Sequence, residues 1–273
     1  MNGPERASAA ATVDSAASVR SRAWAWVTDG PAYPANAGDL RTANVLGLPL
    51  PLRATIAVVA VALLLLLDYH GRINGLVDAL LGPFGTGEAE SKRLQSLGRF
   101  VVQGAIPLAI VLLVLRDRPS RYGLRVGDWR AGVVIAVVGC AVMTPVVLAL
   151  AHVAAFATYY APQGAMTSSP AVALTSALEV LPAEFFFRGF LLFALLRVVG
   201  PIAVVIATLP FAFIHLGKPE VETLSTLAGG LLYGWLDWRT GSVLWSGLTH
   251  TWILSLAVIA AAAAAGTGPA PGS

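Results

Sequence analysis

Long apolar stretches separated by short polar connections dominate the chain from residue 50 onward. A helix that crosses a bilayer needs about 20 mainly apolar residues. The predicted spans are approximately 50–68, 100–115, 131–160, 171–196, 198–216, 223–238 and 243–265. Seven helices is therefore the best count, with six and eight as alternatives. The pattern predicts an all-α fold, a polytopic membrane helix bundle of about seven transmembrane helices.

Four segments follow from this pattern. Residues 1–49 are rich in Ala, Ser, Gly and Pro without a sustained apolar period, which predicts a disordered cytoplasmic N-terminal extension. This extension lacks the apolar core of a signal peptide, so we expect no cleaved signal. Residues 50–119 are predicted as N-terminal membrane helices, 120–265 as the functional core and 266–273 as a flexible tail. An amphipathic stretch within 69–99 is expected to lie on the membrane surface.

Composition narrows the class of protein further. Charged residues make up 12% of the chain and hydrophobic ones 56%, whereas an ordinary soluble domain is about 25% charged. A disulfide-stapled or zinc-ribbon protein is excluded because Cys140 is the single cysteine. The net charge of +3 comes from basic residues between apolar stretches, and nucleotide or nucleic-acid motifs are missing. We therefore expect membrane lipids, and no nucleic acid, as partners.

The arginines also predict an orientation. The connection 116–130 contains five arginines, whereas the connection 161–170 contains neither Lys nor Arg. Positively charged connections face the cytoplasm in most membrane proteins. The sequence thus predicts that 116–130 and the N-terminus are cytoplasmic, and that the cluster of arginines marks the membrane surface.

A few ionisable residues fall inside the predicted spans. Glu179 and Glu184 lie in a region, 131–187, that has no Lys or Arg, and Arg188 follows directly. Ionisable groups at membrane depth face the bundle interior and usually serve function. Glu184 and Arg188 are four residues apart, so they share a helix face and can form an ion pair. The alternative interpretation is that this pair only locks two helices together.

Further polar groups lie on other predicted helices. His215 ends the fifth span, Glu222 follows in the adjoining loop with Lys218, and His250 lies in the last span. His152 has no charged companion in the third span, so we interpret it as structural. A buried carboxylate can accept a proton from water, while histidines position that water or donate to an oxyanion. This set of residues predicts attack of water on a carbonyl group.

Zinc-dependent hydrolysis and nucleophilic attack by a serine are the two alternative chemistries. His215, His250 and Glu184 would be acceptable zinc ligands, but the chain has no HExxH helix, so no metal or other cofactor is expected, although a divalent metal such as zinc is not excluded. Ser246 and His250 share a helix face, but the Gly-x-Ser-x-Gly turn of serine hydrolases is missing.

The ordered set of motifs resembles the CPBP family, the CAAX-processing and bacteriocin-processing (Abi) intramembrane proteases. The similarity spans about 120–265 and includes Glu184-Phe-Phe-Phe-Arg188-Gly, Phe211-x-x-x-His215 and the late His250. The family usually has two adjacent glutamates in the first motif and His-x-x-x-Asn in the last. This chain has Ala183 in place of the first glutamate and Leu254 in place of the asparagine. It thus resembles single-glutamate variants of the family.

The resemblance implies an intramembrane endopeptidase that cleaves a membrane-anchored peptide or protein in a bacterial plasma membrane. In that interpretation Glu184 is the base, Arg188 fixes its charge, His215 shares the water and His250 is the electrophilic donor. Glu222 and Glu179 are alternative bases.

Two other functions are alternatives to proteolysis. A non-catalytic protein of the same fold, with a scaffold, immunity or partner-binding role, is the second hypothesis. A small transporter is a third, although the chain shows no inverted repeat. No oligomeric state is predicted.

Overall fold

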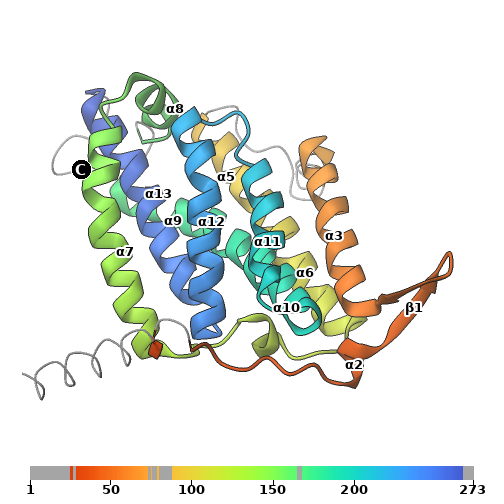
Figure 1. Ribbon diagram of the computed structural model, residues 1–273. Coiled ribbons are helices and arrows are strands. Elements are labelled where there is room, and N and C mark those ends of the chain that lie inside the picture. The colour runs from red at the N-terminus through yellow and green to blue at the C-terminus, as the bar shows by residue number, and fades with distance from the viewer. Residues whose placement is uncertain are drawn as a thin grey trace, which may run out of the picture.

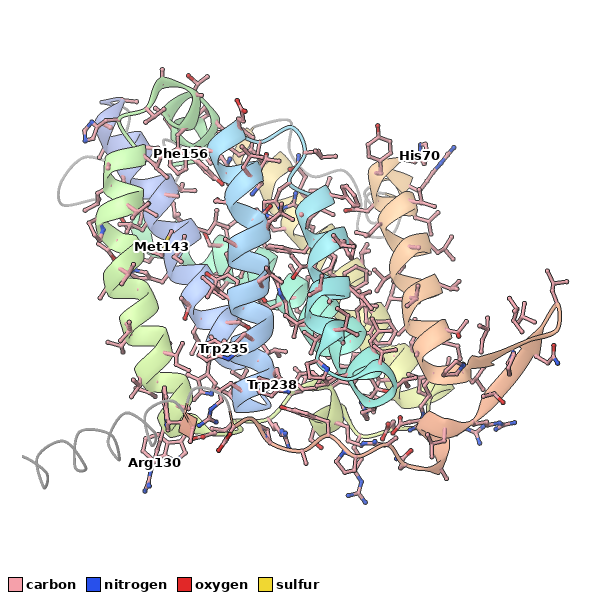
Figure 2. All side chains as sticks on the ribbon, in the orientation of Figure 1. His70, Arg130, Met143, Phe156, Trp235 and Trp238 are labelled. Carbon is pink, nitrogen blue, oxygen red and sulfur yellow. The ribbon has the colours of Figure 1, made fainter. Side chains whose placement is uncertain are left out.

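The computed structural model describes residues 25–26, 29–72, 75, 79, 88–164 and 168–266. Its long helices stand side by side in one bundle, with α7 at one flank and α3 at the other (Figure 1). The side chains of Arg130 and Trp238 lie at one end of this bundle and that of His70 at the opposite end (Figure 2). We call the end near Arg130 the basic end.

The elements follow one another in chain order. The first are α2 Ala37–Leu40, β1 Thr42–Val45, β2 Leu48–Pro51 and α3 Leu52–Tyr69. One helical run follows, made of α5 Glu88–Arg99, π-helix η1 Phe100–Ala105, α6 Ile106–Ala109 and π-helix η2 Ile110–Val114. After the 3-10 helix η3 Pro119–Tyr122 come α7 Trp129–Leu150, α8 Ala154–Gly164, α9 Ser169–Glu184, π-helix η4 Phe185–Leu192, α10 Phe193–Val199, α11 Ile202–Phe213, α12 Glu220–Thr240 and α13 Leu244–Ala264.

The all-α prediction is confirmed, apart from the short β1–β2 hairpin. In the described part of the chain, four helices are long and apolar enough to cross a membrane: Leu52–Tyr69, Leu94–Val114, Trp129–Leu150 and Leu244–Ala264. The count of seven spans is not shown by this structure. These four helices, with their lipid-compatible surfaces, indicate a membrane protein.

The predicted span 131–160 is wrong as a single helix. Helix α7 ends at Leu150, a turn follows, and α8 begins at Ala154. His152 lies exposed in this turn. Apolar residues continue through the turn, which is why hydropathy alone merges the two helices into one span.

The stretch predicted as a disordered extension, 1–49, needs correction where the structure describes it. Residues 37–51 form α2 and the hairpin, while most of 1–28 lies outside the described residues. Asn36 caps α2, and its side chain and that of Asp39 exchange hydrogen bonds with each other's backbone N–H groups. Asp39 is buried and forms a salt bridge with Arg121 at 2.6 Å. A local cap and an ion pair thus order a segment that has few apolar residues.

Arg53 joins the first two candidate spans at the basic end. Its Nη1 lies 3.1 Å from Asp39 and 3.0 Å from Asp117, and its Nη2 donates to the carbonyl of Leu115 at 3.1 Å. Arg53 lies in the first turn of α3, whereas Leu115 and Asp117 directly follow η2. One guanidinium therefore connects the start of one apolar helix to the end of the next.

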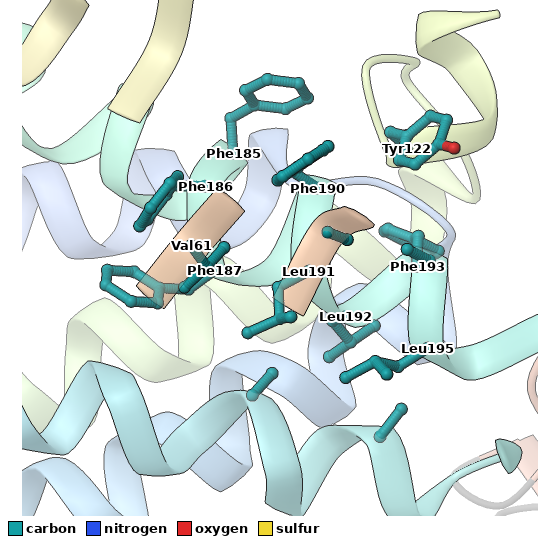
Figure 3. Packing of buried hydrophobic residues seen from close by; sticks show 14 of the residues in the cluster. Val61, Tyr122, Phe185, Phe186, Phe187, Phe190, Leu191, Leu192, Phe193 and Leu195 are labelled. Atoms are coloured by element: carbon teal, nitrogen blue, oxygen red, sulfur yellow. The ribbon is translucent and has the colours of Figure 1, made fainter. Parts of the chain in front are cut away.

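The centre of the bundle is the η4 helix, which continues α9 without a break. All eight of its residues are buried, and the aromatic side chains Phe185, Phe186, Phe187 and Phe190 pack in one core with Val61 of α3 (Figure 3). This core also contains residues from both predicted segments, 50–119 and 120–265.

Glycine is required directly after Arg188. A Cβ at Gly189 would lie 2.8 Å from the carbonyl oxygen of Tyr122 and even closer to the Phe185 ring. The η3 turn can therefore approach the η4 helix closely only because position 189 lacks a side chain.

Backbone and side-chain hydrogen bonds at the basic end set the position of α13. Arg125 donates to the carbonyl of Gly241, and Ser242 donates to the carbonyl of Arg125. Trp245, in the first turn of α13, donates to the carbonyl of Val126. The connection before α7 thus holds the start of α13, which carries His250 into the bundle.

Candidate functional site

The centre of the site is a buried carboxylate with two basic partners. Glu184 is 0% exposed and its Oε1 lies 3.1 Å from Arg188 Nη1 and 2.7 Å from His250 Nδ1. Glu184 and Arg188 come from the α9–η4 helix, whereas His250 comes from α13. The predicted ion pair and the approach of His250 are therefore both present. Because a carboxylate is acceptor-only when ionised, His250 Nδ1 carries the hydrogen and its Nε2 is the basic nitrogen.

His250 is the member of this trio with access to the outside. Its side chain is 19% exposed, compared with 0% for Glu184 and 1% for Arg188. The ring of Tyr233, from α12, stacks on the imidazole with a centroid distance of 5.3 Å. The orientation of His250 is thus fixed on one side by a carboxylate and on the other by an aromatic ring.

The second predicted histidine, His215, lies against Phe211, whose ring also contacts His250. His215 Nδ1 is 2.8 Å from the carbonyl oxygen of Phe211, which can only accept, so Nδ1 carries the hydrogen and Nε2 is free to accept one. The Phe211 ring is 4.6 Å from the His215 ring and 6.1 Å from the His250 ring, between centroids. The guanidinium of Arg188 lies 3.7 Å above the Phe211 ring. Phe211 therefore links all three basic side chains.

Asp237 is a site residue that the sequence did not reveal. It lies in α12, is 0% exposed, and its Oδ2 accepts from the Ser246 hydroxyl at 3.0 Å. Ser246 also interacts with Glu184, and the carboxyls of Glu184 and Asp237 interact electrostatically. Two buried acids thus flank one serine. Asp237 stands beside Trp238 and Arg239 at the end of a predicted span, where a polar residue is ordinary, so its position gave no signal.

Several buried polar atoms of this cluster have no hydrogen-bond partner among the described residues. They are Glu184 Oε2, Arg188 Nη2 and Asp237 Oδ1. Unpartnered buried polar atoms are rare in folded proteins and need a specific explanation, of which a catalytic role is one.

Glu222 belongs to a separate cluster. Its carboxylate lies 2.7 Å from Lys218 Nζ and accepts from the hydroxyl of Tyr160 at 2.7 Å. Its side chain is 17% exposed at the start of α12. Among the described residues, no hydrogen bond or ion pair joins Glu222 to Glu184 or His250, so the structure does not bring this predicted base into the central site.

The remaining candidates have other surroundings. Glu179 forms an ion pair with Arg99, which ties α9 to the helical run that contains α5. Ala183 lies buried beside Glu184, and Leu254 packs against a second apolar core that includes Phe156. At both positions that depart from the usual family motif, the chain therefore has an apolar side chain and no carboxylate.

The zinc alternative can be tested on the same geometry. Among the described residues, no group of three or more His, Cys, Asp or Glu side chains is arranged to hold a metal ion. Both His215 and His250 hold Nδ1 against a protein oxygen, which leaves Nε2 as the available ring nitrogen of each. We assign no step to a metal ion.

Comparison with known proteins supports the resemblance of the motifs. No curated protein and no solved structure matched the chain. A protein-family model described as type II CAAX prenyl endopeptidase Rce1-like matches residues 164–256. The matched region contains Glu184, Arg188, His215 and His250. Over residues 164–256 the chain therefore carries an Rce1-like domain of the type II CAAX prenyl endopeptidase (CPBP) family.

Proposed function

We propose that this protein is an intramembrane endopeptidase that hydrolyses a peptide bond of a membrane-associated substrate. The observation that carries the proposal is the fully buried Glu184, bonded through one oxygen to Arg188 and His250, inside a domain of an endopeptidase family. Charged groups in such surroundings are costly and usually serve function.

The hydrogen bond between Glu184 and His250 suggests that the two act as one unit. His250 Nε2 is the ring nitrogen that Glu184 does not occupy, so it takes a proton from water as that water attacks the peptide carbonyl. Glu184 then stabilises the imidazolium that forms, as a carboxylate does for the histidine of a catalytic triad. The sequence assigns the base to Glu184 itself, and in this scheme Glu184 acts through His250.

His215 and Arg188 complete the scheme. His215 is held with Nδ1 toward the Phe211 carbonyl, so its Nε2 is available to orient the attacking water. Arg188 offsets the charge of Glu184 through its Nη1, so the buried carboxylate keeps a cationic partner while His250 changes its charge. After attack, the protonated His250 returns its proton to the leaving amine.

The substrate class and the location belong to the same proposal. The family name implies a protein substrate, and a site inside a membrane bundle suits a membrane-anchored peptide or protein. We propose a multi-pass protein of a bacterial plasma membrane with its N-terminus in the cytoplasm. The arginines gathered at the basic end, including Arg53, Arg121 and Arg239, support this orientation.

A non-catalytic role is the second candidate, and one observation favours it. Ala183 supplies no carboxylate beside Glu184, and Glu184 Oε1 is already occupied by two partners. A scaffold, immunity or partner-binding protein would need the cluster only for stability.

The experiment compares membrane proteomes by mass spectrometry in strains that carry the wild type or one variant. With Glu184→Gln or His250→Ala, an uncleaved membrane substrate accumulates, whereas it does not with His152→Ala, the exposed control. Loss of cleavage with Glu222→Gln but not with Glu184→Gln would move the base to Glu222. If no variant changes any membrane peptide while a cellular phenotype of the protein persists, the non-catalytic role stands instead.

A further inference from the structure

The β1–β2 hairpin presents apolar side chains that the described part of the chain leaves largely exposed. Its strands are antiparallel, with Val45 opposite Leu48, and the turn between them is Leu46-Gly47. Leu46 is 100% exposed, Leu48 60% and Val45 45%. An isolated two-stranded hairpin is at best marginally stable in water. The hairpin therefore has low intrinsic stability, and its tip carries a fully exposed leucine, Leu46.

The turn residue is unusual for its backbone conformation. Leu46 has φ +52° and Gly47 has φ +86°. Two-residue hairpin turns with two positive φ angles strongly prefer Asn-Gly or Asp-Gly, and a bulky residue there is strained. The turn is also held by Asn44, whose side chain accepts from the Gly47 N–H at 2.8 Å. Leu46 is therefore present at the tip although its positive φ angle disfavours a bulky apolar residue.

The position of the hairpin next to α3 indicates that it lies at the membrane surface. Strand β2 ends at Pro51, and α3, a candidate membrane span, begins at the next residue. The start of a spanning helix lies at the membrane surface, so the base of the hairpin lies there too. Figure 1 shows the hairpin leaving the basic end outward from α3, with its tip turned back toward the level of the helices.

The base of the hairpin is fixed by polar contacts. The Leu52 N–H donates to the carbonyl of Arg41, and Arg53 is bonded to Asp39 and Asp117. Arginines at the base and apolar residues at the tip match the two sides of a membrane surface, where headgroups give way to acyl chains.

We propose that the β1–β2 hairpin inserts its tip, Val45 to Leu48, into the bilayer beside the start of α3. The lipid removes Leu46 from water, and the arginine-flanked base stays among the headgroups. This interaction surface is independent of proteolysis and would remain if the chain had no catalytic activity.

The test uses spin labels on the full chain in vesicles of phosphatidylcholine and phosphatidylglycerol. Cys140, the single native cysteine, is changed to Ala, and a label is placed by Leu46→Cys. Two matched controls are Val137→Cys, on the exposed apolar face of α7, and Ser120→Cys, in the exposed η3 turn at the basic end. Collisions with oxygen report lipid, and collisions with a water-soluble nickel complex report solvent.

The label at position 46 is expected to favour oxygen over nickel, as at position 137 and opposite to position 120. A nickel preference at position 46 equal to that at position 120 would overturn the proposal. A second variant separates insertion from folding of the turn. Leu46→Asn suits the turn better but removes the apolar tip, so a label at Val45→Cys should lose its oxygen preference. An unchanged preference in that variant would also refute insertion by the tip.

Discussion

Glu184 and Glu222 are each paired with a cation four residues away, yet their surroundings have little in common. Glu184 is inaccessible to solvent and shares one oxygen between Arg188 and a histidine from another helix. Glu222 is 17% exposed and bonds to Lys218 and a tyrosine hydroxyl at the start of a helix. The same spacing therefore produces a candidate catalytic group in one place and a partly exposed ion pair in the other. Burial and a partner from a distant helix make the difference.

The largest contrast between the two clusters is expected in activity. Replacing His250 by Ala removes the proton acceptor of the proposed site, so peptide cleavage should fall by about 10²- to 10⁴-fold. Tyr160→Phe removes the hydroxyl that bonds to Glu222 and should leave cleavage unchanged. Cleavage of an accumulating membrane substrate by the purified variants, compared at equal protein concentration, measures both. A loss in Tyr160→Phe equal to that in His250→Ala would place catalysis at the Glu222 cluster.

The next contrast is in stability. Arg188→Met leaves Glu184 buried without its cation, which should lower the free energy of unfolding by about 3–5 kcal/mol. Lys218→Met disrupts a partly exposed pair and should cost about 0–1 kcal/mol. Denaturant unfolding in detergent compares the two variants. Equal losses would show that burial does not distinguish the two ion pairs.

A smaller effect is expected from the serine between the two buried acids. Ser246→Ala leaves Asp237 Oδ2 without its donor, and an unmade buried hydrogen bond costs about 1–3 kcal/mol. Thr249→Ser is the control on the same helix, because the retained hydroxyl still reaches the Trp245 carbonyl. Thermal unfolding of both variants measures the cost. A Ser246→Ala protein as stable as the control would mean that Asp237 does not depend on Ser246.

The smallest effect concerns the ion network at the basic end, away from both glutamates. Burial opposes ionisation of Asp39, but hydrogen bonds from the Asn36 N–H and from Arg121 and Arg53 lower the pKa of its carboxyl. A carboxyl with a lowered pKa in the folded state stabilises the protein above its unfolded pKa, and this contribution is lost as the pH falls through the folded value.

Asp39→Asn should therefore cost about 1 kcal/mol at neutral pH and progressively less in acid. Thermal unfolding across acidic to neutral pH compares this variant with wild type. If the unfolding temperatures of variant and wild type differ by the same amount at every pH, ionisation of Asp39 does not contribute to stability.

Much of the central site was predictable because it depends on spacing along one helix. The interval from Glu184 to Arg188 fixes their shared face, and the motif order indicated that His215 and His250 approach them. Asp237 could not be found in this way, since its hydrogen bond with Ser246 and its electrostatic interaction with Glu184 join separate helices. Only tertiary packing determines which of several polar residues near helix ends turns inward.

The fold shows the same division between local and tertiary signals. Apolar length predicted α3 and α13 well. It missed the turn after Leu150, because the residues in that turn remain mostly apolar. It also missed the β1–β2 hairpin, whose short alternation of Leu and Pro carries too weak a pattern and whose order depends on Asp39 and Arg53.

The guanidinium of Arg53 has a consequence for how the chain threads through the membrane. Because it holds the start of α3 and the end of η2 together, both points lie on one face of the bilayer. The first two candidate spans then run in opposite directions across the bilayer, and Arg72, just after the end of α3, lies toward the opposite face. The salt bridge between Arg53 and Asp117 can form only if the two spans cross the bilayer in opposite directions. A chain inserted the other way at only one of these spans would leave that salt bridge unmade.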